Sequence, residues 1–147
     1  MSGGGPHNGE YDDAETNYEL AHAIWASQAA ASGPVAQLNL TYVTLAKRDH
    51  ELARRRFLHS AARFADQGRP GFELFGRLGL LASLAGLQRA DDASEMLDRI
   101  DALLEDVSIV DTDLAEPAHI AGELLLEVDA HALARRSLEI ARTQYEQ

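Results

Sequence analysis

Residues 53–60 read Ala-Arg-Arg-Arg-Phe-Leu-His-Ser, and the spacing within this stretch decides the fold class. A small residue is followed four positions later by a bulky apolar residue, and three positions after that by a small or apolar residue. The same spacing recurs in residues 14–21, 93–100 and 134–141, so the four leading alanines are 39, 40 and 41 residues apart. A fixed period of a few tens of residues is typical of stacked helical hairpins. Small residues let neighbouring helices approach closely, and the bulky residue fills the space between them.

The apolar periodicity outside these stretches also indicates helices, separated by glycine and proline breakers. It predicts seven helices and no strand, with the helices at residues 11–31, 34–47, 50–67, 71–87, 90–106, 116–128 and 130–145. The carboxylates of Asp49 and Asp129 are expected to cap the third and seventh helices by accepting free backbone N–H groups. Residues 106–115, the longest connection, are expected to form an ordered loop against the helices.

The repeated spacing resembles the second helix of the tetratricopeptide repeat, and Gly-Glu-Tyr-Asp-Asp-Ala at residues 9–14 resembles the turn into that helix. Twelve residues ahead of the last three alanines, where the family usually has Leu followed by a small residue, stand Leu40-Thr41, Leu80-Leu81 and Ala121-Gly122. Leu81 departs from the pattern, and a turn one residue shorter would place Ala82 there instead. The period also exceeds the family's common value of about 34 residues, as in its longer-helix variants.

The resemblance covers about residues 9–145 and implies an all-α fold, a right-handed α-α superhelix of about seven helices. These would form three hairpins and one unpaired N-terminal helix in a repeat domain at residues 9–147, after a flexible segment at residues 1–8. Because the array opens with a helix that resembles the second helix of a hairpin, the first helix that would pack against one side of Tyr18, Ile24 and Trp25 is missing. We therefore expect a truncated or C-terminal piece of a longer array, or a homodimer that pairs through the uncapped ends.

Charge and composition narrow the classes of partner. The 24 acidic and 13 basic residues give a net charge of −11, which repels the phosphates of nucleic acids and anionic membrane surfaces, so neither is an expected partner. The chain has no cysteine, which excludes disulfides, thiolate metal sites and cysteine nucleophiles. No signal-peptide core or run long enough to span a bilayer occurs, so a cytoplasmic location is expected.

The resemblance implies that a partner polypeptide binds in the groove lined by the first helix of each hairpin. The groove residues are then Leu38, Asn39, Tyr42, Leu45, Phe75, Leu78, Gly79, Ala82, Glu116, His119 and Glu123. We expect contacts from all of these except Gly79, Ala82 and Glu116, and Tyr42 is the best candidate because its hydroxyl prefers a partner. Leu38 and Leu45 could instead belong to the core. A clamp for chaperone tails needs Lys, Asn and Arg in the groove, and only Asn39 fits. An apolar groove with an acidic end suits a basic amphipathic segment better.

Other candidate sites have simpler interpretations. The six histidines, among them His22, His59 and His131, lack the helical spacing of a zinc site, so no metal or cofactor is expected. Asp111 and Asp113 lack the glycine and ligand spacing of a calcium loop. The arginines at 54–56 point in different directions on a helix and are expected to form a solvated face. No motif of a catalytic site occurs, so an enzyme is not expected.

The sequence therefore predicts a scaffold for protein–protein interaction that holds a partner in its concave groove. Two alternatives remain open: the sensory or regulatory arm of a larger bacterial signalling protein such as a kinase, ATPase or transcription regulator, and a self-association module. If the groove assignment is right, Tyr42→Ala and Phe75→Ala should weaken partner capture with little change in melting temperature.

Overall fold

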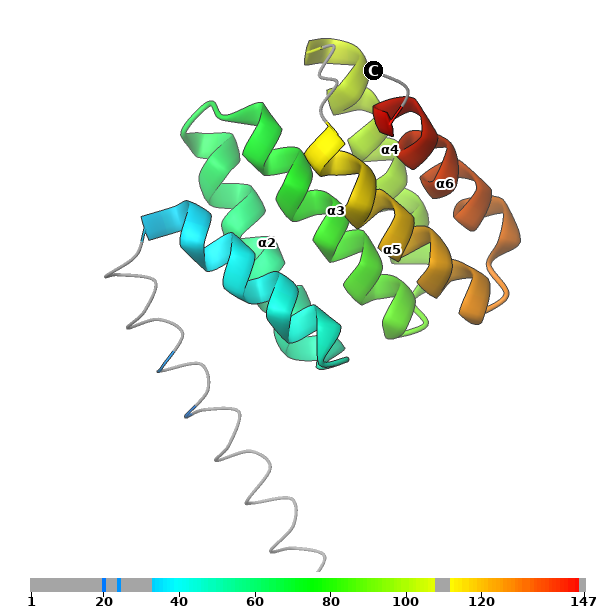
Figure 1. The fold of residues 1–147 in the computed structure, drawn as a ribbon, viewed down its shortest axis with the longest axis horizontal. Helices are drawn as coiled ribbons and strands as arrows, with labels where there is room; N and C mark the ends of the chain where they lie inside the picture. Colours follow the sequence, from blue (N-terminus) through cyan, green and yellow to red (C-terminus); the bar gives the residue numbers. More distant parts are fainter. Residues whose placement is uncertain (1–19, 21–23, 25–32, 108–111, 146–147) are drawn as a thin grey trace, which may run out of the picture. The chain divides into compact units, whose positions relative to one another are not determined.

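The computed structural model describes Leu20, Ile24 and residues 33–107 and 112–145, and this part of the chain is helical apart from short turns (Figure 1). A helix over 33–46 is followed by α2 (His50–Asp66), α3 (Pro70–Gly86), α4 (Ala90–Val107), the 3-10 helix η1 (Thr112–Leu114), α5 (Ala115–Glu127) and α6 (His131–Tyr145). The described residues contain no strand. The all-helical prediction is thus confirmed. The expected helix at 11–31 and the segment at 1–8 fall outside the described residues, apart from Leu20 and Ile24.

The chain forms two compact units, residues 1–40 and residues 41–147, and the packing described below lies within the second. In that unit α3 packs against α2, α4 and α5, and α5 packs against α6. In Figure 1, α3 and α5 lie side by side in front of α4. The sequence neighbours α2 and α3, α3 and α4, and α5 and α6 are therefore in contact. α4 does not pack against α5; instead α5 packs against α3.

Four of the turns between these helices share one geometry; the connection from α4 to α5, which includes η1, does not belong to them. Each of the four linkers has three residues, and its middle residue has a positive φ: 62° at Arg48, 65° at Gly68, 60° at Gln88 and 62° at Asp129. In each turn the N–H of the middle residue donates to the carbonyl three positions back, and the N–H of the next residue to the carbonyl five positions back. This pair of bonds defines the Schellman motif, which ends a helix by satisfying its last carbonyl groups.

The last residue of each linker also starts the next helix. The carbonyl oxygens of Asp49, Arg89 and Ala130 accept the N–H groups of Ala53, Ala93 and Ala134 at 2.9 Å. The predicted carboxylate caps were wrong. Asp49 is the N-cap residue of α2, but its side chain makes no capping hydrogen bond. Asp129 lies two positions before the first residue of α6, so it is not the residue that caps this helix. With φ in the left-handed region, Asp129 ends α5, and its carboxylate lies 3.7 Å from the His131 imidazole.

The repeated alanines occupy equivalent positions. Ala53, Ala93 and Ala134 are each the fourth residue of their helix, and the solvent reaches none of them (0% exposed). The bulky residues Phe57 and Leu97 are also fully buried, whereas Leu138 is partly exposed. The first copy, at Ala14, lies outside the described residues.

The equal turns settle the register of the middle repeat. Thr41, Leu81 and Gly122 each stand seven residues before the positive-φ residue of their turn. Leu81, and not Ala82, therefore takes the position where a small residue was expected, and it is fully buried there.

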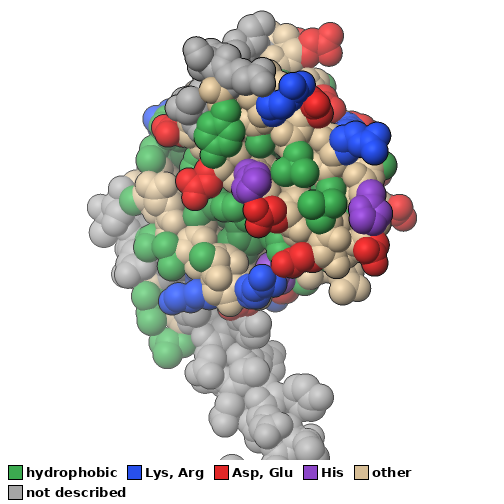
Figure 2. Space-filling model, turned by 45° about the vertical axis from the view of Figure 1, so that its right-hand side comes forward, with side chains coloured by type: hydrophobic (Ala, Val, Ile, Leu, Met, Phe, Trp, Pro, Cys, Tyr) green, Lys and Arg blue, Asp and Glu red, His purple; other side chains and the backbone are tan. Residues whose placement is uncertain are grey.

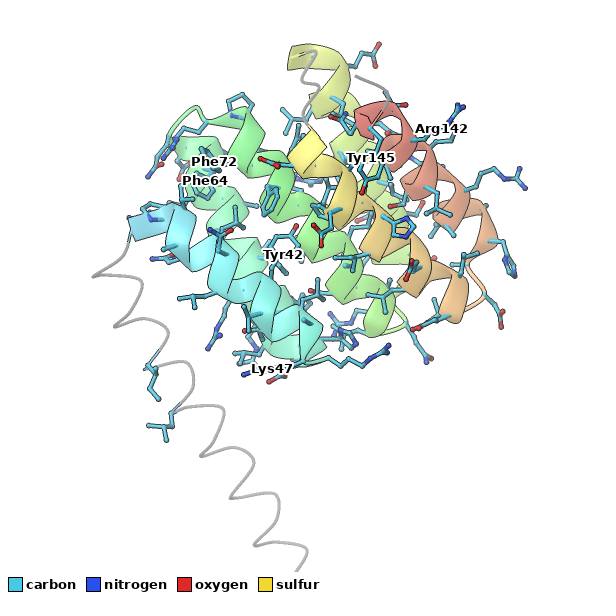
Figure 3. The ribbon with its side chains drawn as sticks, in the orientation of Figure 1. Tyr42, Lys47, Phe64, Phe72, Arg142 and Tyr145 are labelled. Atoms are coloured by element: carbon cyan, nitrogen blue, oxygen red, sulfur yellow. The ribbon has the colours of Figure 1, made fainter. Side chains whose placement is uncertain are left out.

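Close contacts join the helices within the unit. A Cβ atom added to Gly79 of α3 would lie 2.4 Å from the Phe57 ring of α2, so the missing side chain makes room for that ring. At the turn from α2 to α3 the Phe64 and Phe72 rings stack with centroids 5.2 Å apart (Figure 3). In the last hairpin the Ser137 hydroxyl of α6 donates to the Ala118 carbonyl of α5 at 2.7 Å. None of the helices in the described part has the length and apolar character required to cross a bilayer.

Candidate partner-binding cleft

A cleft of about 260 Å³ opens between residues 42–50 and α5. Its apolar lining comes from Tyr42, Leu45, Ala46, Ile120 and Leu124. Its polar lining comes from Arg48, His50, Glu123 and Glu127. The cleft thus joins the end of one helix, a turn and the start of α2 to a helix some seventy residues further along the chain.

Helical spacing brings these residues together on each wall. Residues 120, 123, 124 and 127 are three, four and seven positions apart, so they share one face of α5. Tyr42, Leu45 and Ala46 have the same three- and four-residue spacing on the opposite wall. The sharp turn at Arg48 then places His50 at the first position of α2, beside that wall.

An exposed ion pair and an exposed histidine–glutamate contact form the rim. The Arg48 guanidinium lies 3.5 Å from the Glu127 carboxylate, and both side chains are more than half exposed. The His119 imidazole lies 2.5 Å from the Glu123 carboxylate one helical turn away. Because exposed pairs contribute only about 0–1 kcal/mol, they leave the rim side chains free to rearrange.

His50 supplies a neutral side chain at the edge of the cleft. Burial lowers its pKa from 6.5, the Arg48 charge lowers it further, and the weaker effects of Asp49 and Glu127 oppose them. A Cβ atom added to Gly86 of α3 would lie 2.5 Å from the ring, so the imidazole packs directly on that glycine. Its Nδ1 atom is buried without a hydrogen-bond partner among the described residues. The imidazole is therefore uncharged at neutral pH.

Tyr42 is held more firmly than the sequence suggested. Its hydroxyl donates to the Phe75 carbonyl oxygen at 2.5 Å, and its ring centroid lies 4.7 Å from the rings of both Phe57 and Phe75. Figure 3 shows Tyr42 beside α3. Burial raises the pKa of Tyr42 well above 10, so the phenol stays protonated. Because the hydroxyl is already used, Tyr42→Ala would also remove internal packing, and the expectation of an unchanged melting temperature no longer follows.

The structure divides the eight predicted contact residues. Tyr42, Leu45 and Glu123 line the cleft, and His119 is paired to Glu123 at its edge. Leu78 is 1% exposed and Leu45 is 4% exposed, so both serve mainly as core, and Phe75 binds Tyr42. In the unit of residues 1–40, Leu38 is buried and Asn39 is exposed.

The sequence reasoning missed six of the lining residues: Ala46, Arg48, His50, Ile120, Leu124 and Glu127. Ile120 and Glu127 could have been found, because they lie three and four residues from Glu123 on the same face of α5. Arg48 and His50 carried no such signal, since only the left-handed turn at Arg48 decides where they lie.

The size of the cleft limits what it can hold. Sites for cofactors and drug-sized molecules usually measure about 300–1,000 Å³, so this cleft is matched to side chains and not to a whole small molecule. No group of His, Asp and Glu that could bind a metal ion occurs in the part of the chain that the structure describes. A second hollow of about 390 Å³ lies between α5 and α6, lined by Leu126, His131, Arg135, Leu138, Glu139 and Arg142, and holds none of the predicted contacts.

Three comparisons bear on identity. Neither the protein-family models, nor the curated proteins, nor the solved structures include one that matches this chain. The resemblance to tetratricopeptide repeats therefore depends on the residues and the repeated spacing described above.

Proposed function

We propose that this chain is a tetratricopeptide-like helical solenoid that acts as a protein-binding scaffold and holds a partner polypeptide at the cleft between residues 42–50 and α5. The observation that carries the proposal is this cleft, which is apolar within, has charged side chains at its rim and is sized for side chains. A segment that lies across first-type helices and inserts side chains between them fits such a surface.

The repeated geometry supports the architectural half of the proposal. Three hairpin turns of equal length, with their buried alanines at the same helix position, are what stacking of equivalent units requires. In such stacks the first helices of successive hairpins lie side by side, as α3 and α5 do here. The cleft lies on that row of helices, because it is lined by the end of helix 33–46 and by α5.

A bulky substitution tests the assignment without disturbing the core. Ala46 lines the cleft but is exposed, so Ala46→Trp should fill the space with little effect on folding. We expect affinity purification from the native cell to recover the partner with the wild-type chain and to lose it, by about tenfold or more, with Ala46→Trp. Recovery would be quantified by mass spectrometry.

Ala102→Trp is the matched control, because Ala102 is exposed on α4 and does not line the cleft. It should keep the same partner. If both variants capture the partner as the wild-type chain does, at unchanged melting temperature, the cleft is not the binding site.

A further inference from the structure

We propose that the cleft receives a basic side chain of the partner, an arginine or lysine, which meets the Glu127 carboxylate in place of the chain's own Arg48. This inference rests on the proposed scaffold function and specifies the chemistry of its ligand. Arg48 then acts as an internal competitor that occupies the acidic rim until a partner displaces it.

The charges on the cleft favour a cationic occupant. Glu116, Glu123 and Glu127 are exposed and lie on one face of α5, at intervals of seven and four residues. Arg48 is the single cation among the lining residues, since burial keeps His50 neutral. Figure 2 shows acidic side chains beside hydrophobic ones on the face turned toward the viewer. An anionic segment would be repelled by this wall, and a cationic one attracted.

The contact between Arg48 and Glu127 is loose enough to be exchanged. Its 3.5 Å separation exceeds the 2.7–2.9 Å or so of a charge-assisted hydrogen bond, and the two side chains are 67% and 52% exposed. Arg77 and Glu73 on α3, by contrast, pair at 2.6 Å with side chains 17% and 13% exposed. A partner guanidinium that enters the cleft can approach Glu127 more closely than Arg48 does.

The apolar lining suits the stem of a basic side chain. Leu45, Ile120 and Leu124 line the cleft below the charged rim. Arginine and lysine bury their methylene groups along apolar surface while their charge stays at the edge. A cleft of about 260 Å³ has room for such a stem together with a neighbouring apolar residue.

Titration of the full chain with acetyl-Leu-Arg-Leu-amide, followed by amide NMR spectra, tests this chemistry. We expect amide chemical-shift changes centred on residues 45–50 and 120–127. A control peptide with glutamine in place of the arginine should bind roughly fivefold more weakly, which is the range of an exposed ion pair. Glu127→Gln should weaken binding of the arginine peptide by a similar factor. Glu105→Gln, an exposed carboxylate on α4, should leave the affinity unchanged.

Removal of the competitor provides the sharper result. Arg48→Gly should tighten binding of the arginine peptide severalfold, because Glu127 is then unpaired, and glycine is favoured at the positive φ of this position. Gln88→Gly makes the same backbone change in the turn after α3, away from the cleft, and should not alter the affinity.

Equal affinity for the arginine and glutamine peptides, no gain on Arg48→Gly, or no shifts at millimolar peptide would each overturn the inference. The scaffold function is judged separately. If Ala46→Trp abolishes partner capture and Glu127→Gln does not, the scaffold stands and the basic ligand is wrong. If the peptide binds as expected and the Ala46→Trp variant captures the partner as well as the wild-type chain does, the scaffold assignment is wrong.

Discussion

Gly79 shows how one residue sets the distance between two helices. It lies in the interior of α3, where glycine is usually about 1 kcal/mol less favourable than alanine. Here the absence of a side chain leaves space for the Phe57 ring, which is fully buried. The local cost in helix propensity is thus offset by packing between α2 and α3.

Gly79→Ala should therefore destabilise the protein by roughly 1–3 kcal/mol, because the added methyl group would lie 2.4 Å from the fully buried Phe57 ring. Urea unfolding measures the change. Gly71→Ala is the control: it lies in the same helix with nothing within 4 Å of the added atom, and should be neutral or stabilising. Equal behaviour of the two variants would contradict the packing described here.

His50 gives a prediction on pH. Its pKa is lowered in the folded chain, so the folded state binds a proton there less readily than the unfolded state, whose value is 6.5. The stability that this residue contributes is therefore complete above about pH 6.5 and is lost as the pH falls through the lower folded value. In His50→Gln, the free energy of unfolding should fall less steeply below pH 6.5 than in the wild-type chain. Identical pH slopes in the two proteins would show that the imidazole is not desolvated.

The turns are the feature that the elements share. Three-residue linkers with one left-handed residue join four pairs of helices, although only one of them has glycine at that position. The left-handed conformation costs roughly 1–2 kcal/mol for residues with a Cβ atom. Arg48, Gln88 and Asp129 adopt it because the helices on either side hold the backbone in place.

Opposite substitutions at equivalent turn positions should therefore change stability in opposite directions. We expect Gly68→Ala to lower the free energy of unfolding by about 1 kcal/mol and Gln88→Gly to raise it by about 0.5–1 kcal/mol. Space plays no part at Gly68, since nothing lies within 4 Å of an added Cβ atom. Guanidinium unfolding at constant m-value would measure both changes. The same sign for both variants would argue against a shared turn.

At the scale of the whole molecule, the in-phase alanines predict that separate hairpins respond alike. Ala53→Leu and Ala93→Leu should each destabilise the protein by roughly 1–3 kcal/mol, because both sites are fully buried at the same helix position. Thermal unfolding followed by circular dichroism is the measurement. Ala102→Leu, at an exposed site of α4, is the control and should change the melting temperature little. A loss at only one of the two buried sites would contradict their equivalence.

The placement of the helices was largely predictable, whereas the cleft was predictable only in part. Helices from residue 34 onward were found because their apolar periodicity and their breakers are local features of the chain. Glu123 and Tyr42 were selected through the family resemblance, and both line the cleft. Leu78 was selected by the same reasoning and belongs to the core, since which side of α3 is buried depends on where the neighbouring helices pack.

The sequence by itself determined the helical class and the recurrence of the alanines about every forty residues. The helical class depends on apolar residues within one or two helical turns of each other, and the recurrence can be counted along the chain. Only the tertiary structure decided that Arg48 meets Glu127 and that Phe57 lies against Gly79. It also decided that Leu81 takes the place of a small residue. Those contacts join residues tens of positions apart, and their geometry follows from how the helices stack.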